Sequence, residues 1–260
     1  MTGILPAEWL KLRSVRSTWY VVGVVALVTA GALLLSWYGA HLWDTLPAER
    51  RAHLAVAPPT PLIEPVLEIC LGVLGVLTLA GEHGRGTIAA TLTAVPRRGT
   101  VFAAKTVVTA GVALIVGLAA VVGTSLGGRA LVGDRPIAGL TDAATRSTPL
   151  LFAYAGSVVV AALLGLAVGA ILRSTVGAIV CLVGIVYVVP MVVWHLPDPV
   201  GRWASSLVLD ALPQQAVGLH NEHSVYGDAL PAPVALAVLA AYAVVPLTVA
   251  AVLFRRRDVG

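Results

Sequence analysis

The chain has 260 residues, of which 58% are hydrophobic and only 12% are charged, and its net charge is +4. Soluble domains carry about 25% charged residues, so this composition excludes an ordinary soluble enzyme and indicates a membrane protein. The sequence shows no basic face with interleaved aromatic residues, which argues against nucleic-acid binding. Cys70 and Cys181 lie in apolar stretches without a nearby Cys or His, so neither a disulfide framework nor a zinc site is predicted.

Residues 4–16 precede the first long apolar stretch and are moderately amphipathic. Leu5, Trp9 and Leu12 share one helical face, and Glu8 lies away from it. Such a helix can lie in the membrane interface with its basic side chains at the headgroups. We therefore predict an interfacial helix that uses Trp9, Lys11, Leu12, Arg13 and Arg16. The alternative is a plain positive anchor that only sets the topology.

Six stretches are long and apolar enough to cross a bilayer, which takes about 20 residues. The predicted spans cover residues 19–40, 61–81, 103–126, 149–172, 175–195 and 232–254. The sequence therefore predicts an all-α integral membrane protein with six transmembrane helices in one domain over residues 1–260. Two spans carry small residues four apart, which predicts close helix contacts. These residues are Ala119, Gly123 and Gly127 in the third span and Ala161, Gly165 and Gly169 in the fourth.

The second span is the least regular, because Glu64 and Glu68 fall in its outer third. Acidic residues within a membrane usually face a cavity or a partner. One interpretation is that both line an outer exit path or attract a cationic substrate. We favour the other, in which both lie at the outer interface and are wetted by headgroups.

Charge on the connections predicts the orientation. One face has 11 basic residues and three acidic ones, whereas the other has six basic and eight acidic residues. The positive-inside rule assigns the first face to the cytoplasm, so both termini are expected there and the chain is expected in the plasma membrane. The 11 basic residues are Lys11, Arg13, Arg16, Arg85, Arg97, Arg98, Lys105, Arg173, Arg255, Arg256 and Arg257.

The inner segment 82–98 is basic and opens with glycines. Residues 87–95 are compatible with a short helix that Pro96 would end. Such an exposed helix between two spans could transmit force from a soluble partner, and the alternative is a basic loop anchored to lipid phosphates. Its glycines are not a nucleotide-binding loop, because no Gly-Lys-Ser/Thr follows them.

The outer segment 196–231 is the longest connection and contains four prolines. It includes His220, Glu222 and His223, whose spacing matches no zinc pattern well, so we predict a solvated loop and no metal. No His-Glu-x-x-His motif, Ser–His–Asp set or intramembrane Asp pair is present in the sequence, which disfavours an intramembrane protease.

Three segments in order resemble the membrane subunit of type-two ABC exporters in their six-span bacterial form. They are the basic pre-span stretch Glu8–Arg16, the segment from Glu82 through Gly86-Thr87, Thr91-Leu92 and Pro96-Arg97 to Lys105, and Leu212-Pro213-Gln-Gln-Ala216. The resemblance covers nearly the whole chain. His83-Gly84 departs from the bulkier residues often found after the Glu.

The resemblance implies a permease that dimerises with a second copy or homologue and pairs with a separate ATP-binding cassette subunit. ATP and Mg would bind to that partner, and this chain would bind no cofactor and catalyse no reaction. Segment 82–98 would be the coupling helix, and 196–231 would partly re-enter the outer leaflet. The implied interface with the ATPase comprises Glu82, Arg85, Gly86, Thr87, Thr91, Leu92, Pro96, Arg97, Arg98 and Lys105.

The expected function is therefore ATP-driven export of an amphiphilic solute, such as a drug, a peptide antibiotic or a lipid-like molecule. Two alternatives stay open at this point. An ATP-independent secondary transporter or channel predicts deep intramembrane charges in several spans or an inverted repeat, and only the second span carries acids. The other alternative is a membrane immunity or assembly factor that binds a ligand without moving it.

Overall fold

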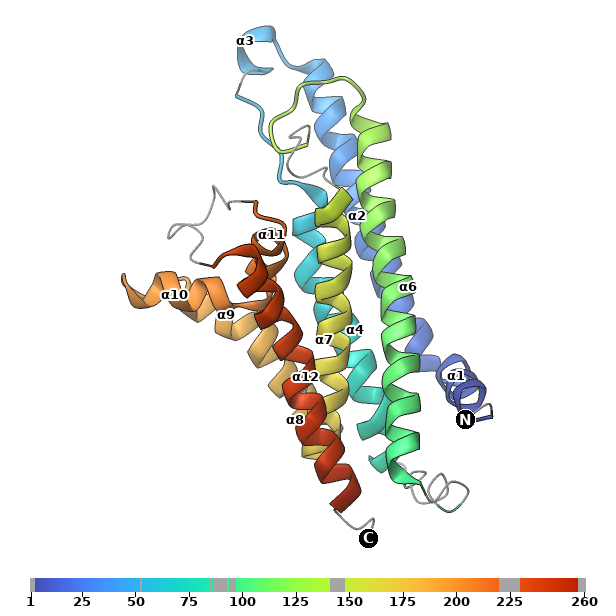
Figure 1. Cartoon of the computed structure of the whole chain (residues 1–260). Coiled ribbons are helices and arrows are strands. Elements are labelled where there is room, and N and C mark those ends of the chain that lie inside the picture. The colour runs from blue at the N-terminus through green and yellow to red at the C-terminus, as the bar shows by residue number, and fades with distance from the viewer. Residues whose placement is uncertain are drawn as a thin grey trace.

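The computed structural model describes residues 3–51, 53–84, 86, 93, 97–140, 148–219 and 230–256. These residues are almost entirely helical, and within the described ranges the only β pairing is an isolated bridge between Ala55 and Ala138. A short helix α1 (Ile4–Ser14) lies across the bundle axis, and longer helices run along it (Figure 1). The beginning of α1 and the end of the last helix lie toward the same end of the bundle, as six crossings require.

Six helical segments of the described chain have the length and apolar composition of membrane spans, which confirms the predicted number. They are α2 (Arg16–Thr45), α4 (Pro59–Gly84), α6 (Arg98–Val132), α7 (Thr148–Leu172), the run Thr175–Val193, and α12 (Ala232–Arg256). The run Thr175–Val193 comprises α8 (Thr175–Val183), a π-helical turn η2 (Gly184–Val188) and α9 (Val189–Val193).

Helices α2 and α6 are longer than the predicted spans 19–40 and 103–126. At 1.5 Å per residue, the 35 residues of α6 extend about 52 Å, well beyond a hydrocarbon core of about 30 Å. The extra turns are held together beyond the span. Arg135 donates two hydrogen bonds to Asp44, at 2.9 and 2.8 Å, and Val132, Ile137 and Leu140 form a small apolar cluster there.

Helix α7 lies in the middle of the bundle and packs closely against α4 (Figure 1). Glycines allow this approach, because a Cβ on Gly75 would overlap the carbonyl oxygen of Ala162 and one on Gly165 would overlap that of Gly72. The predicted contact through the small residues of the fourth span is therefore confirmed, and it lies within one chain. In the third span, a Cβ on Gly127 would meet the Leu33 side chain of α2, whereas one on Gly123 would meet no atom of another element within 4 Å.

The connection between α2 and α4 contains the short helix α3 (Ala48–Arg51). Between α9 and α12 the chain forms the short helices α10 (Val200–Leu207), η3 (Leu209–Ala211) and α11 (Leu212–Ala216). Helix α10 turns away from the bundle axis, and the chain then returns through α11 beside α7 and α12 (Figure 1). Gln214 donates a hydrogen bond to the Tyr154 hydroxyl at 3.0 Å, and the Tyr242 hydroxyl donates one to the Leu207 carbonyl at 3.0 Å. These bonds fix the segment against the bundle. Its predicted re-entry into the outer leaflet stays a prediction.

Candidate functional site

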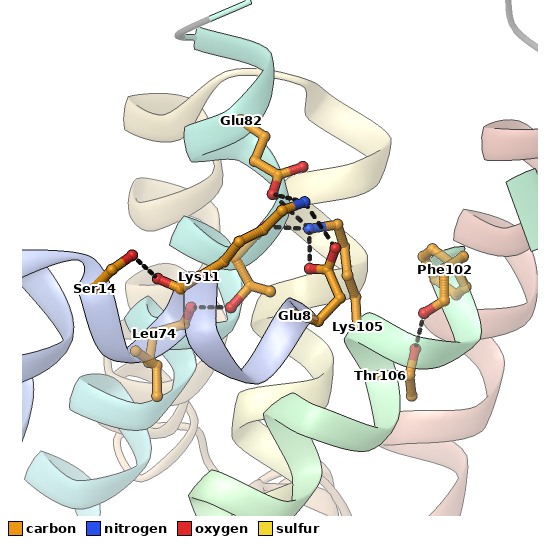
Figure 2. A network of polar contacts seen from close by, with 9 residues as sticks. Glu8, Lys11, Ser14, Leu74, Glu82, Phe102, Lys105 and Thr106 are labelled. Carbon is orange, nitrogen blue, oxygen red and sulfur yellow. Dashed lines mark hydrogen bonds and ion pairs between the residues drawn. The ribbon is translucent and has the colours of Figure 1, made fainter. Parts of the chain in front are cut away.

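A cluster of buried charges joins three helices at the end of the bundle where α1 lies. The Lys105 ammonium of α6 is 1% exposed and donates to Glu8 Oε2 of α1 at 2.7 Å and to Glu82 Oε1 of α4 at 2.7 Å. A longer contact of 3.4 Å reaches the Thr78 carbonyl. Lys105 therefore neutralises carboxylates on two other helices at once (Figure 2).

A second ammonium completes this cluster, which we name the Lys105 cluster: Glu8, Lys11, Glu82 and Lys105. Lys11 Nζ lies 2.8 Å from Glu8 Oε1 and 3.4 Å from Glu82 Oε1, and its side chain is 42% exposed. The two cations and two carboxylates balance one another. A buried network of this kind is stable only when each member finds its partner, so the three helices hold one another in register.

The neighbouring charges shift the pKa values of the two α1 residues in the cluster, Glu8 and Lys11. Burial alone would raise the pKa of Glu8, but attraction to Lys105 and hydrogen bonds from Lys105 and Lys11 outweigh it and hold the pKa below its usual value. Burial likewise opposes the charge of Lys11, yet the Glu8 and Glu82 carboxylates raise its pKa above the usual value. Both groups are therefore charged at neutral pH.

The face of α1 that packs against the bundle differs from the face predicted from the sequence. Leu5, Trp9 and Leu12 were expected to share the apolar face with Glu8 away from it, but Glu8 and Leu12 are the residues that the helix buries. Trp9 is 46% exposed, and Leu5 is exposed as well. The reason is that Glu8 and Leu12 are four apart and lie on one face, so the ion pair with Lys105 and the packing of Leu12 turn that face toward α6.

The remaining basic residues of the predicted interfacial helix, Arg13 and Arg16, are exposed. The Trp19 indole donates to the Arg13 carbonyl at 2.9 Å, which ties the first turn of α2 back to the end of α1. This arrangement suits a helix at a membrane surface, and its location in the interface stays a prediction.

The predicted coupling segment is described in part. Gly86 has a positive φ of 69°, a conformation that glycine adopts readily and that turns the chain after α4. Arg97 is exposed and Arg98 is the first residue of α6, where Gly99 lies against the Arg255 guanidinium of α12. Of the other predicted interface residues, Glu82 and Lys105 belong to the Lys105 cluster, whereas five lie outside the described residues: Arg85, Thr87, Thr91, Leu92 and Pro96.

The outer pair Glu64 and Glu68 is not placed as the favoured interpretation required. Their exposed fractions are 3% and 0%, so neither carboxyl group is wetted by headgroups. Helix α7 covers them, and the Ser157 hydroxyl donates to Glu64 at 3.0 Å, while both Glu68 oxygens have no hydrogen-bond partner among the described residues. Their role in an outer pathway stays a prediction.

Three residues around this pair were not singled out from the sequence: Tyr154, Ser157 and Asp210. Tyr154 is 1% exposed, and burial raises the pKa of Asp210 in η3. A signal was available in part, because Tyr154 and Ser157 lie three apart on one face of the fourth span. His220, Glu222 and His223, for which no metal was predicted, lie outside the described residues.

Comparison with known proteins identifies the family. A search of curated proteins finds no match. A family model described as ABC-2 family transporter protein matches residues 4–259, which is nearly the whole chain and includes all six spans and the Lys105 cluster. The chain therefore belongs to the ABC-2 family of transporter proteins, as a membrane-embedded permease component.

Proposed function

We propose that the chain is the permease subunit of an ATP-driven exporter that moves an amphiphilic solute outward. ATP and Mg would bind to a separate ATP-binding cassette subunit, and a second copy or homologue of this chain would complete the pathway. Family membership supports the permease role. The excess of basic residues at the end where α1 lies supports a cytoplasmic location for both termini.

The observation that carries the proposal is the position of the Lys105 cluster. Glu82 stands near the end of α4 and is the first residue of segment 82–98, and Lys105 stands two turns into α6, which begins where that segment ends. A load applied to that segment would reach both helices through the backbone and α1 through Glu8. The cluster thus gives a soluble partner a rigid junction through which to move α1, α4 and α6 together.

Coupling would then proceed by movement of packed helices. Closure of the ATPase would displace segment 82–98, and the Lys105 cluster would pass the displacement to α4 and α6 without slippage. Helix α7 would follow α4, because the glycine contacts at Gly75 and Gly165 allow almost no space between the two backbones. Alternating exposure of a cavity between two permease copies would carry the solute outward.

The first test is to purify the tagged full-length chain from its native membrane and to identify the proteins that accompany it. We expect an ATP-binding cassette ATPase, and we expect vesicles containing both proteins to export amphiphilic probes only with ATP and Mg. Transport that proceeds without ATP, together with absence of any copurifying ATPase, would support the secondary-transporter alternative and contradict the proposal.

A matched pair of charge reversals locates the ATPase interface. Arg97→Glu changes an exposed residue beside α6, and Arg50→Glu changes an exposed residue of α3 at the other end of the bundle. We expect Arg97→Glu to reduce the amount of copurifying ATPase and Arg50→Glu to leave it unchanged. Equal loss in both variants would argue against an interface at the Lys105 end.

A further inference from the structure

The acidic pair Glu64 and Glu68 lies in the half of α4 away from the Lys105 cluster and has no cation of its own. The two carboxyl groups are one turn apart on one face, about 8 and 14 Å along α4 from its first residue. Their exposed fractions are 3% and 0%, and within the part of the chain that the structure describes no Lys, Arg or His forms an ion pair with either. Acidic groups buried in a span usually serve a partner or a pathway.

The short helices after α9 close the bundle beside this pair. Ser157 of α7 donates to Glu64 at 3.0 Å, and Tyr154, one turn earlier on α7, accepts a hydrogen bond from Gln214 of α11 at 3.0 Å. Apolar side chains of η3 and α11 also share one cluster with α4, which includes the residue after Glu68. We name α10, η3 and α11 together the cover.

The unpartnered polar atoms of the acidic pair and of the cover are all hydrogen-bond acceptors. Both Glu68 oxygens are buried without a hydrogen-bond partner among the described residues. In the cover, the same holds for Asp210 Oδ1 and for Oε1 of Gln215, a side chain that is only 3% exposed. Buried acceptors are normally satisfied by a donor. A ligand that fits here therefore brings N–H groups and a positive charge.

Apolar side chains surround the acidic pair on α4. Ile63, Leu67 and Leu71 are at most 2% exposed, and they belong to the apolar cluster that also contains Tyr154. A few polar groups in an apolar lining are typical of sites for organic ligands with an apolar body. A divalent metal ion fits less well, because it takes about six or more oxygen ligands. In the described ranges no three His, Cys, Asp or Glu side chains come together as metal ligands.

We propose that Glu64, Glu68 and the cover bind the ammonium or guanidinium group of an amphiphilic cation, and that such cations are the class of solute exported. This inference rests on the proposed function and adds the substrate class to it. In the structure the cover is closed and Glu68 is wholly buried, so the cation reaches the pair when the cover separates from α7. Its N–H groups then donate to the acceptors, and its charge compensates the carboxyl groups.

Equilibrium binding to the full-length chain tests the site without ATP or a partner protein. The chain is placed in phosphatidylcholine nanodiscs, and empty nanodiscs correct for partition into lipid. The probes share one apolar chain and differ in charge: dodecylguanidinium, dodecanol and dodecanoate. We expect dodecylguanidinium to bind at least about tenfold more tightly than the other two, which cannot form the charge-assisted hydrogen bonds. Equal binding of all three probes, or tightest binding of dodecanoate, would overturn the inference.

A matched pair of variants locates the cation. Glu68→Gln keeps the shape of the side chain and removes its charge, and Glu49→Gln makes the same change on the exposed helix α3. We expect the preference for dodecylguanidinium over dodecanol to fall at least about tenfold in Glu68→Gln and to stay unchanged in Glu49→Gln. An unchanged preference in Glu68→Gln, or an equal loss in both variants, would overturn the site.

Transport in vesicles that also contain the copurified ATPase separates this inference from the proposed function. We expect ATP-dependent export of dodecylguanidinium and little export of the other two probes. Export of all three probes at equal rates would keep the exporter and overturn the cation site. Charge-selective binding without ATP-dependent export would support the binding site and contradict the proposed exporter.

Discussion

Two buried acidic regions lie on the same helix, α4, and differ in whether cations accompany them. Glu82 is near one end and shares Lys105 and Lys11 with Glu8. Glu64 and Glu68 lie about 21–27 Å away along the helix, at 1.5 Å per residue. Ser157 donates to Glu64, and no Lys, Arg or His among the described residues forms an ion pair with either of them.

The difference indicates what each region contributes. Removal of one of the three buried members of the Lys105 cluster, Glu8, Glu82 or Lys105, leaves an uncompensated buried charge, so these three depend on one another. Glu68 has no hydrogen bond to lose within the described chain, and burial of a polar group without a hydrogen-bond partner carries a cost. The Lys105 cluster is therefore a structural junction, whereas Glu64 and Glu68 contribute little to stability. The role of this pair in an outer pathway remains a prediction to be tested.

The largest effect is expected for Lys105→Met, which keeps an unbranched side chain of similar size and removes its charge. Glu8 and Glu82 then lose their buried cation, and we expect a loss of about 3–5 kcal/mol in the free energy of unfolding. Thermal or chemical unfolding of the detergent-solubilised chain measures it. The control is Lys11→Met, at a half-exposed position, where we expect a loss of about 1 kcal/mol or less. Equal losses in the two variants would show that burial of Lys105 does not make its contribution to stability larger than that of Lys11.

The next effect concerns the helix pair that connects the two regions. In Gly75→Ala the added methyl group meets the Ala162 carbonyl, so α4 and α7 must separate, and we expect a loss of about 1–3 kcal/mol in unfolding free energy. Gly123→Ala makes the same change on α6, where no atom lies within 4 Å, and it should be neutral or slightly stabilising. A neutral Gly75→Ala would mean that α4 and α7 do not pack through their backbones.

A smaller effect is expected from pH. The folded-state pKa of Glu8 is below its ordinary value of 4.5, so its contribution is present above that pH and is lost as the pH falls through the folded-state pKa. The pKa of Lys11 is above 10.5, so its contribution is lost only as the pH rises beyond that value. We therefore expect the stability difference between the wild type and Glu8→Gln to be constant from about pH 5 to 10 and to shrink below about pH 4.5. A difference that stays constant at low pH would contradict the depressed pKa of Glu8.

The smallest effect is expected at the other acidic region. Glu68→Leu removes a carboxyl group without a hydrogen-bond partner in the described structure, so unfolding free energy should change by less than about 1 kcal/mol or should increase. Glu64→Leu also loses the Ser157 hydrogen bond and should cost about 1 kcal/mol more. A large loss in Glu68→Leu would remove the contrast between the two regions. If transport falls while stability does not, the pathway role gains support.

The sequence alone predicted much of this architecture. Six spans followed from hydropathy, and Glu82, Lys11 and Lys105 were each named in functional segments. The buried role of Glu8 was missed, because its partner Lys105 is 97 residues away and no local pattern links them. The length of α6 was also missed, because polar residues after residue 126 end the apolar signal while contacts with the outer loops continue the helix.

The placement of Glu64 and Glu68 shows a second limit of sequence patterns. Two acidic residues near a predicted membrane boundary are compatible with headgroup contact, and only the packing of α7 and the segment containing η3 shows that both are enclosed. The residues of α7 that contact α4 were predictable from the small residues Ala161, Gly165 and Gly169. The glycines of α4 that contact them were not identified from the sequence.

The central claim is that the Lys105 cluster passes ATPase movement to the spans. It is tested most directly by the ratio of solute exported to ATP hydrolysed in vesicles that contain the permease, its ATPase and the triple substitution Glu8→Gln, Glu82→Gln and Lys105→Met. This variant removes the three most buried charges together, which spares the cost of leaving one of them uncompensated. We predict a folded complex that still hydrolyses ATP but exports at least about tenfold less solute per ATP. An unchanged ratio would contradict the account.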